Sequence, residues 1–140
     1  MVRAGGAFLN ARHSPEMADK ALGGPSFSDV YVFPGGVRLP ISATLAEAEK
    51  AGFDVRDVES LREHYVLTLR HWVRRLEEHA EEARSATDDV TYRVWRLFMS
   101  FSAHQFERGA IGVYQTLLIK PDGGRSGLPL TREDWYRDGP

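Results

Sequence analysis

The sequence predicts an α/β domain with an incomplete sheet, and three observations support this prediction. Apolar residues recur at three- and four-residue steps over two long segments, 62–84 and 88–108, which is the period of helices packed on one side. Residues 111–119 form an almost continuous apolar run of strand length, typical of a strand covered on both faces. Such a strand needs a neighbour on each edge, and the best candidates are only two short segments, 7–11 and 53–59.

Composition and charge exclude several classes of protein. The chain has 140 residues, which suits one domain, and its mixed charges sum to −2 without the clustered basic face that nucleic acid needs. The absence of cysteine excludes disulfides and thiolate chemistry. The longest apolar stretch is far short of a membrane span, and the N-terminus lacks the apolar core of a secretory signal. We therefore expect a cytoplasmic protein.

The chain divides into four parts. Residues 7–11 are predicted to form a short buried strand, and residues 14–40, rich in Gly, Pro and Ser, a long loop. A loop of this length in a compact domain is usually functional or poorly ordered. We predict a single partial domain with a strand over 1–13, a loop over 14–40, a helix-strand-helix-helix-strand core over 41–120 and a tail over 121–140.

A short helix and a strand open the predicted core. Ser42 or Thr44 can cap a helix over 44–51, and Gly52 can end it by adopting a positive φ. Residues 53–59 then form a strand whose alternation of apolar side chains breaks once, which predicts a bulge or an early end.

The two long helices have the clearest pattern. Thr87 is predicted to cap the second helix, which stops at Gly109. The apolar arc of this helix is wider than one stripe, so we expect it to be buried on two sides. Trp72 and Trp95 lie at the spacing of core residues and are predicted to belong to the core.

Four blocks of sequence follow one another over nearly the whole chain. They are Tyr31 to Gly36 with Leu39-Pro40, Phe53 to Trp72, Phe106 to Lys120, and Leu128 to Tyr136. In this order, the blocks resemble stretches of the cyclopropane-fatty-acyl-phospholipid synthases and the related mycolic acid methyltransferases. One block alone would be weak evidence, whereas four in register strongly favour this family.

The resemblance implies the C-terminal portion of a doubly wound, Rossmann-like methyltransferase sheet, with about three strands, three main helices and no cofactor-binding half. Members of the family transfer a methyl or methylene group from S-adenosylmethionine to unsaturated acyl chains of phospholipids. In their site a bicarbonate ion acts as the base, held by a Cys, a Glu, a His, an Ile backbone group and a Tyr. The resemblance thus implies part of an enzyme that is not active alone, and that works at the membrane periphery if it meets its lipid.

Site residues carry over only in part. Tyr65 matches the family's tyrosine, and its phenol can donate a hydrogen bond to the bicarbonate. The family's histidine follows Leu-Asn in the first strand, where this chain has Leu9-Asn10-Ala11. His13 lies two residues further, on the same side of an extended strand. The chain has no cysteine, and Ala11 stands at the position of the family's histidine. Tyr65 is therefore the one catalytic residue that the resemblance assigns.

Three aromatic residues of the predicted loop are candidates for substrate binding. Phe27, Tyr31 and Phe33 could line a channel for the acyl chain, and a hydrophobic plug is an equally good interpretation of the same residues.

No cofactor or metal site is predicted within the chain. Gly5-Gly6 precedes a strand, and Gly23-Gly24 and Gly35-Gly36 lie in loops that contain proline, so none has the strand–turn–helix context of a nucleotide-type cofactor site. Zinc sites on helices favour histidines at i,i+4, which these helices lack. Neither S-adenosylmethionine nor bicarbonate is expected to bind this chain alone.

Other interpretations stay open beside the partial enzyme, which would be a truncated gene product, a product of a frame-split gene or one half of a two-chain enzyme. A non-catalytic module would use the helix face around Phe98, Phe101 and Phe106 to pair with a full-length relative, with a separate S-adenosylmethionine-binding chain or with itself. A remnant without function is the third possibility. Because an open sheet edge invites pairing, we expect self-association or marginal stability. We expect no nucleic-acid partner.

Overall fold

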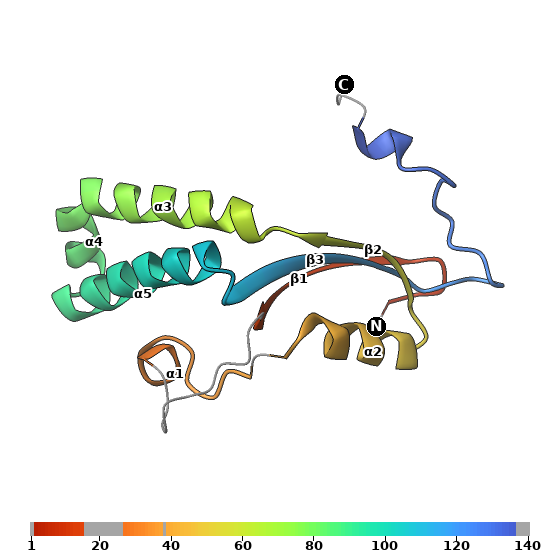
Figure 1. Ribbon diagram of the computed structural model, residues 1–140, viewed down its shortest axis with the longest axis horizontal. Helices are drawn as coiled ribbons and strands as arrows, with labels where there is room; N and C mark the ends of the chain where they lie inside the picture. The colour runs from red at the N-terminus through yellow and green to blue at the C-terminus, as the bar shows by residue number, and fades with distance from the viewer. Residues whose placement is uncertain (1, 16–26, 38, 137–140) are drawn as a thin grey trace.

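The computed structural model describes residues 2–15, 27–37 and 39–136 of the chain. Residues 16–26 of the predicted loop, including Gly23-Gly24, and residue 38 lie outside the described residues. Three strands form one antiparallel sheet in the order β1-β3-β2 (Figure 1). The strands are β1 (Ala7–Pro15), β2 (Asp54–Ser60) and β3 (Ile111–Ile119). The predicted α/β class and the three-stranded partial sheet are therefore confirmed.

The central strand of the sheet is β3, in agreement with its apolar run. Its side chains alternate between the two faces of the sheet, and both faces hold buried residues. Val113 and Ile119 are buried on one face, and Thr116 and Leu118 on the other. Burial on both faces explains why the apolar run of β3 lacks the polar alternation of a strand that faces water.

The two outer strands differ from the prediction in length and regularity. β1 continues to Pro15, beyond the predicted end at residue 11, because its whole length pairs with β3 from Ile119 back to Ile111. In β2 the register shifts between Val55 and Asp57, so the predicted irregularity is confirmed.

Helices lie around and beyond the sheet. In Figure 1, α3 and α5 run side by side as a hairpin closed by α4, and this hairpin extends past one end of the sheet. The short α2 lies beside the sheet near β2. The helices of the described residues are α1 (Phe27–Tyr31), α2 (Ile41–Lys50), α3 (Arg62–Glu78), α4 (Ala80–Ala86) and α5 (Asp89–Glu107), with a 3-10 turn, η1, at Glu133–Tyr136.

The start of α2 differs from the prediction. The helix begins at Ile41, directly after Pro40, and no side chain of its own caps it. Instead the hydroxyl oxygen of Ser14, a buried residue of β1, accepts a hydrogen bond from the Ile41 N–H at 3.0 Å. A residue distant in sequence therefore satisfies an N–H group of the first turn, the kind of role that Ser42 or Thr44 was expected to have in a helix starting three residues later. The end of α2 agrees with the prediction, since Gly52 follows it at φ 77°.

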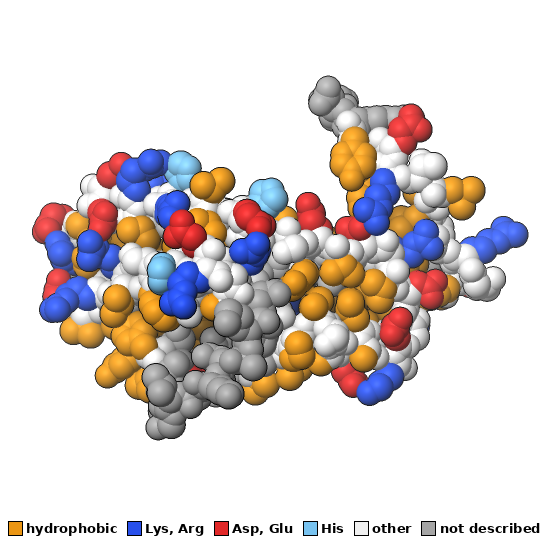
Figure 2. Space-filling model, viewed as in Figure 1, with side chains coloured by type: hydrophobic (Ala, Val, Ile, Leu, Met, Phe, Trp, Pro, Cys, Tyr) orange, Lys and Arg blue, Asp and Glu red, His pale blue; other side chains and the backbone are white. Residues whose placement is uncertain are grey.

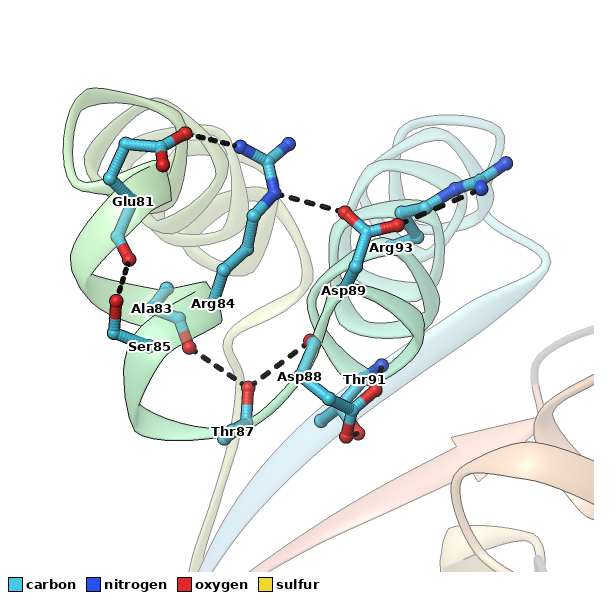
Figure 3. A network of polar contacts seen from close by, with 9 residues as sticks. All are labelled: Glu81, Ala83, Arg84, Ser85, Thr87, Asp88, Asp89, Thr91 and Arg93. Carbon is cyan, nitrogen blue, oxygen red and sulfur yellow. Dashed lines mark hydrogen bonds and ion pairs between the residues drawn. The ribbon is translucent and has the colours of Figure 1, made fainter.

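The turn between α4 and α5 is also capped differently from the prediction. The Asp88 carboxylate accepts hydrogen bonds from the Thr91 backbone N–H at 2.9 Å and the Thr91 hydroxyl at 2.7 Å (Figure 3). Both hydrogen bonds lower the pKa of the Asp88 carboxyl, and the one from the Thr91 hydroxyl has the larger effect. The Thr87 hydroxyl donates back to the Ala83 carbonyl, so Thr87 ends α4 and Asp88 starts α5. His79 separates α3 from α4 within the segment predicted as one helix.

The core lies where the helical hairpin meets the sheet. It unites residues of α3, α5 and β3: Leu69, Met99, Ala103, Phe106 and Val113. The predicted core roles of Trp72 and Trp95 are wrong, because these side chains are 50% and 41% exposed.

The expected burial of α5 on two sides is wrong as well. One side packs against α3 and β3, whereas Val90, Leu97 and Phe101 on the other side are exposed. Phe33, in the segment after α1, makes edge-to-face contacts with Trp95 and Phe98 of α5 at ring-centroid distances of 6.5 and 5.6 Å, and Phe98 also packs against the core. Figure 2 shows hydrophobic side chains among the charged ones on the surface of the helical hairpin.

Candidate functional site

The structure brings Tyr65 and His13 together, although the two residues are distant in sequence. Their ring centroids lie 6.2 Å apart in an edge-to-face arrangement. Both rings also contact Phe106, at centroid distances of 5.5 Å from His13 and 5.5 Å from Tyr65. We call these three residues, from β1, α3 and α5, the ring cluster.

The central strand positions both polar members of the ring cluster. His13 pairs with Val113 of β3. On the other side of β3, the Leu61 N–H donates to the Val113 carbonyl at 2.8 Å, which anchors the start of α3. The Tyr65 N–H then donates to the Leu61 carbonyl at 2.9 Å, so Tyr65 lies in the first turn of α3. The antiparallel register of β1 and β2 on β3 therefore dictates that His13 and Tyr65 meet.

The ring cluster has an apolar floor and an open polar side. Phe106 is fully buried, Tyr65 is half-buried and His13 is exposed. A phenol and an imidazole at the surface above an apolar floor can both hydrogen-bond one small anion or pass a proton. Ala11, the position of the family's histidine, pairs with Gln115 and has no group that could take part. Sequence reasoning placed His13 on the correct side of β1 but did not place it beside Tyr65.

Two arginines of α3 secure the helices around the ring cluster. Arg62 Nη1 donates to the Phe106 carbonyl at 3.4 Å, and Arg62 also pairs with Glu63. Arg70 pairs with Glu107 at 2.8 Å, which links α3 to the end of α5. These contacts fix the end of α5 where Phe106 forms the floor of the cluster.

The predicted acyl-binding residues lie in two places. Phe27 and Tyr31 of α1 pack against each other at a centroid distance of 5.2 Å and line an open cavity of about 770 Å³ between α1 and α5. Phe33 does not line this cavity and instead packs on Trp95 and Phe98. The other residues that line the cavity are Glu77, Arg84, Val90, Tyr92, Arg93, Val94, Arg96 and Leu97.

The cavity and the ring cluster lie toward opposite ends of α5. Leu97, in the cavity wall, precedes Phe106 by about 14 Å along the helix at roughly 1.5 Å per residue. Phe101 lies between them in sequence and is 52% exposed. Leu97 and Phe101 therefore share the open side of α5, whereas Phe106 lies on its packed side.

The strand-to-helix turn after β2 lacks the glycine-rich pattern on which nucleotide-type cofactors sit in doubly wound sheets. The strand-to-helix turn that the structure describes, from β2 through Ser60 and Leu61 to α3, contains no glycine. Gly35 and Gly52 adopt positive φ in turns that follow helices. Within the described ranges, no three His, Asp or Glu side chains gather as a metal site. None of the helices described has the length and apolar content to traverse a lipid bilayer.

Comparison with known sequences agrees with this architecture. The family model described as mycolic acid cyclopropane synthetase matches residues 1–116. A probable fatty acid methyltransferase of Pseudomonas putida is 41% identical over 97% of this chain, and one of Mycobacterium tuberculosis is 35% identical over 97%. The chain spans 36% and 32% of the lengths of these two relatives.

Solved structures give the same result. The mycolic acid cyclopropane synthase CmaA1 complexed with SAH and CTAB superposes with a TM-score of 0.72 and 26% identity, covering 81% of this chain and 44% of CmaA1. The cyclopropane synthase MmaA2 from Mycobacterium tuberculosis gives a TM-score of 0.70 and 27% identity with the same coverage. The chain therefore matches a part of a methyltransferase fold, and it belongs to the mycolic acid cyclopropane synthetase family.

Proposed function

We propose that this chain forms the acyl-chain side of a methyltransferase site that modifies unsaturated acyl chains of phospholipids. The observation that carries the proposal is the ring cluster, where Tyr65, the residue expected to contact the family's base, lies beside a second polar ring. The relatives named as fatty acid methyltransferases support the substrate class. The chain would meet its lipid at the membrane periphery.

The ring cluster would hold the base of the reaction. In this proposal, the Tyr65 phenol donates a hydrogen bond to a bicarbonate ion, and a bound bicarbonate would supply the base that removes a proton from the reacting chain. Phe106 keeps water away from the buried side of the cluster. The site is incomplete, because Ala11 replaces a histidine of the family pattern and the chain has no cysteine.

The acyl chain would lie along the open side of α5. Phe27, Tyr31 and Leu97 line the cavity together with charged side chains, and the exposed Phe101 lies one turn beyond Leu97 on the same side of α5. Phe33 would contribute indirectly, by packing on Trp95 and Phe98 and shaping the rim of this surface.

The methyl donor would be held elsewhere. Because the turn after β2 lacks the glycine-rich pattern of nucleotide-type cofactor sites, S-adenosylmethionine would bind a portion of the family fold outside these 140 residues, and the chain alone would be inactive. We expect no change in melting temperature when S-adenosylmethionine is added to the chain, because a ligand stabilises only a protein that binds it. A stabilisation that grows with ligand concentration would contradict this assignment.

A chimera tests the whole proposal. Residues 1–140 replace the matching region of the Pseudomonas putida relative, and methylated or cyclopropanated fatty acids are measured by gas chromatography. The chimera should be active, and Tyr65→Phe should lower turnover about 10- to 100-fold, since a hydrogen bond to a charged group contributes roughly 1.5–3 kcal/mol.

The matched control is Tyr136→Phe, which removes the same hydroxyl from an exposed residue of η1 and should leave turnover unchanged. A folded chimera that binds S-adenosylmethionine but makes no product would overturn the proposal. Turnover by the 140-residue chain alone would overturn the claim that it is inactive.

A further inference from the structure

The cavity between α1 and α5 combines apolar side chains with guanidinium groups. Its apolar lining comes from both helices and includes Phe27 and Leu97. A pocket with an apolar wall and a few charged groups suits an amphiphile, a molecule with an apolar chain and a polar end. The charged residues that line the cavity are Arg84, Arg93, Arg96 and Glu77. Because arginines outnumber acids in this lining, the polar end that fits is an anion.

Two of the three arginines already bind carboxylates closely. Arg84 lies between Glu81 at 2.8 Å and Asp89 at 3.0 Å, so two acids neutralise it (Figure 3). Arg96 directs its Nε and Nη2 groups to one oxygen of Glu77 at 2.6 Å. A guanidinium has five N–H donors, so Arg96 keeps donors on its Nη1 group for a ligand.

Arg93 is the arginine of the cavity with the weakest protein contact. Its Nη1 approaches the Asp89 carboxylate only at 3.8 Å, beyond hydrogen-bond distance, and 76% of its side chain is exposed. Asp89 itself binds Arg84 more closely (Figure 3). Arg93 and Arg96 are three residues apart on α5 and are therefore neighbours on its surface. Guanidinium groups bind the oxygens of a phosphate through paired N–H groups, which makes this pair suited to a phosphate.

We propose that Arg93 and Arg96 bind the phosphate of a phospholipid whose acyl chain lies against Phe27 and Leu97. This inference rests on the proposed function and names the part of the substrate that the cavity holds. Arg93 precedes Phe106 by about 20 Å along the helix axis at roughly 1.5 Å per residue. In an extended phospholipid, the glycerol and the first half of the acyl chain separate the phosphate from a mid-chain double bond by a comparable length. A lipid held at Arg93 therefore presents its double bond at the level of the ring cluster.

Isothermal titration calorimetry of the 140-residue chain tests phosphate recognition without turnover. The probes are a short-chain lysophosphatidylglycerol and the monoacylglycerol with the same acyl chain, each below its micelle concentration. The wild-type chain should bind the phospholipid about tenfold more tightly, which corresponds to roughly 1.4 kcal/mol. Arg93→Gln and Arg96→Gln should each lower this preference, because each removes a charged donor to the phosphate.

Arg74→Gln is the matched control. Arg74 is an exposed arginine of α3 that approaches the Glu78 carboxylate at 3.9 Å, much as Arg93 approaches Asp89, and it does not line the cavity. Its substitution should leave the preference intact. Equal binding of the two probes by the wild type, an unchanged preference in Arg93→Gln, or a loss of preference in Arg74→Gln would overturn the proposal. Inorganic phosphate that binds as tightly as the phospholipid would overturn it too, because the site would then recognise a free anion.

The active chimera separates this inference from the proposed function. Arg93→Gln should raise KM for phospholipid vesicles and leave kcat unchanged, because it removes binding that ground state and transition state share. Tyr65→Phe should instead lower kcat. If Tyr65→Phe lowers turnover and Arg93→Gln changes neither constant, the phosphate site is refuted and the proposed function stands. If Tyr65→Phe leaves turnover unchanged, the proposed function is refuted, and the calorimetric preference still decides the phosphate site.

Discussion

The two sides of α5 are both apolar, but only one of them stabilises the described fold. On the packed side, Met99 and Phe106 lose nearly all contact with water against α3 and β3. On the open side, Leu97 and Phe101 remain 56% and 52% exposed. Because hydrophobic stabilisation scales with the apolar area removed from water, the packed side contributes most of the free energy of folding that α5 provides.

The difference shows that the apolar residues of α5 fall into two groups, one that packs in the core and one that stays exposed. The packed side connects the helical hairpin to the sheet, and it ends in Phe106, the floor of the ring cluster. The open side faces the cavity beside α1, where the proposed acyl chain would bind. Substitutions on the packed side should therefore act on stability, and substitutions on the open side on binding.

The largest effect is expected on the packed side. Phe106→Ala should lower the free energy of unfolding by about 3–5 kcal/mol, because it leaves a cavity where a fully buried ring contacts His13, Tyr65 and the core. Urea unfolding followed by circular dichroism measures this loss. Phe106→Leu is the control, since it keeps most of the volume and should cost less. Equal stability of Phe106→Ala and wild type would refute the division of α5 into two sides.

A smaller loss of stability is expected from a substitution at the first residue before α5, where the helix cap supports the whole helix. Asp88→Ala removes the acceptor for the Thr91 N–H and hydroxyl and should lower the melting temperature at pH 7 by less than Phe106→Ala does. Hydrogen bonds from Thr91 lower the pKa of the Asp88 carboxyl in the folded state. The Asp88 carboxylate therefore stabilises the fold at pH values above its ordinary pKa of 3.8, and this stabilisation is lost as the pH falls below that value.

The pH dependence separates the charge of Asp88 from its capping geometry. Asp88→Asn keeps an acceptor oxygen but cannot titrate. Its melting temperature should therefore fall less steeply on acidification than that of the wild type. Parallel acid profiles of the two proteins would show that the Asp88 charge does not contribute.

Sequence patterns predicted the elements of the fold because those elements depend on local chemistry. The apolar run of β3, the period of the long helices and Gly52 at the end of α2 are all properties of neighbouring residues. The Ser14 cap of α2 could not be predicted, because it joins two elements that are distant in sequence. The exposure of Trp72 and Trp95 could not be predicted either, because helical spacing indicates an apolar side but not what covers it.

In the candidate site, too, local features could be predicted from the sequence, whereas contacts between distant segments could not. Resemblance to a family assigned Tyr65, and strand alternation placed His13 on the same face as Ala11. The contact between His13 and Tyr65 depends on the order β1-β3-β2 and on the bond from Leu61 to Val113, neither of which a single segment encodes. The cavity beside Phe27 likewise depends on where α1 lies relative to α5.

The smallest effect on stability is expected on the open side of α5. Phe101→Ser should lower the free energy of unfolding by about 1 kcal/mol, well below the loss expected for Phe106→Ala, because only about half of the ring is removed from water. In the active chimera the same substitution should raise KM for lipid vesicles with little change in kcat, since it removes apolar contact that ground state and transition state would share. Ser100→Ala, a neighbouring exposed position, should leave both constants unchanged. If Phe101→Ser instead destabilises the chain as strongly as Phe106→Ala, both sides of α5 are covered in solution and the acyl chain must bind elsewhere.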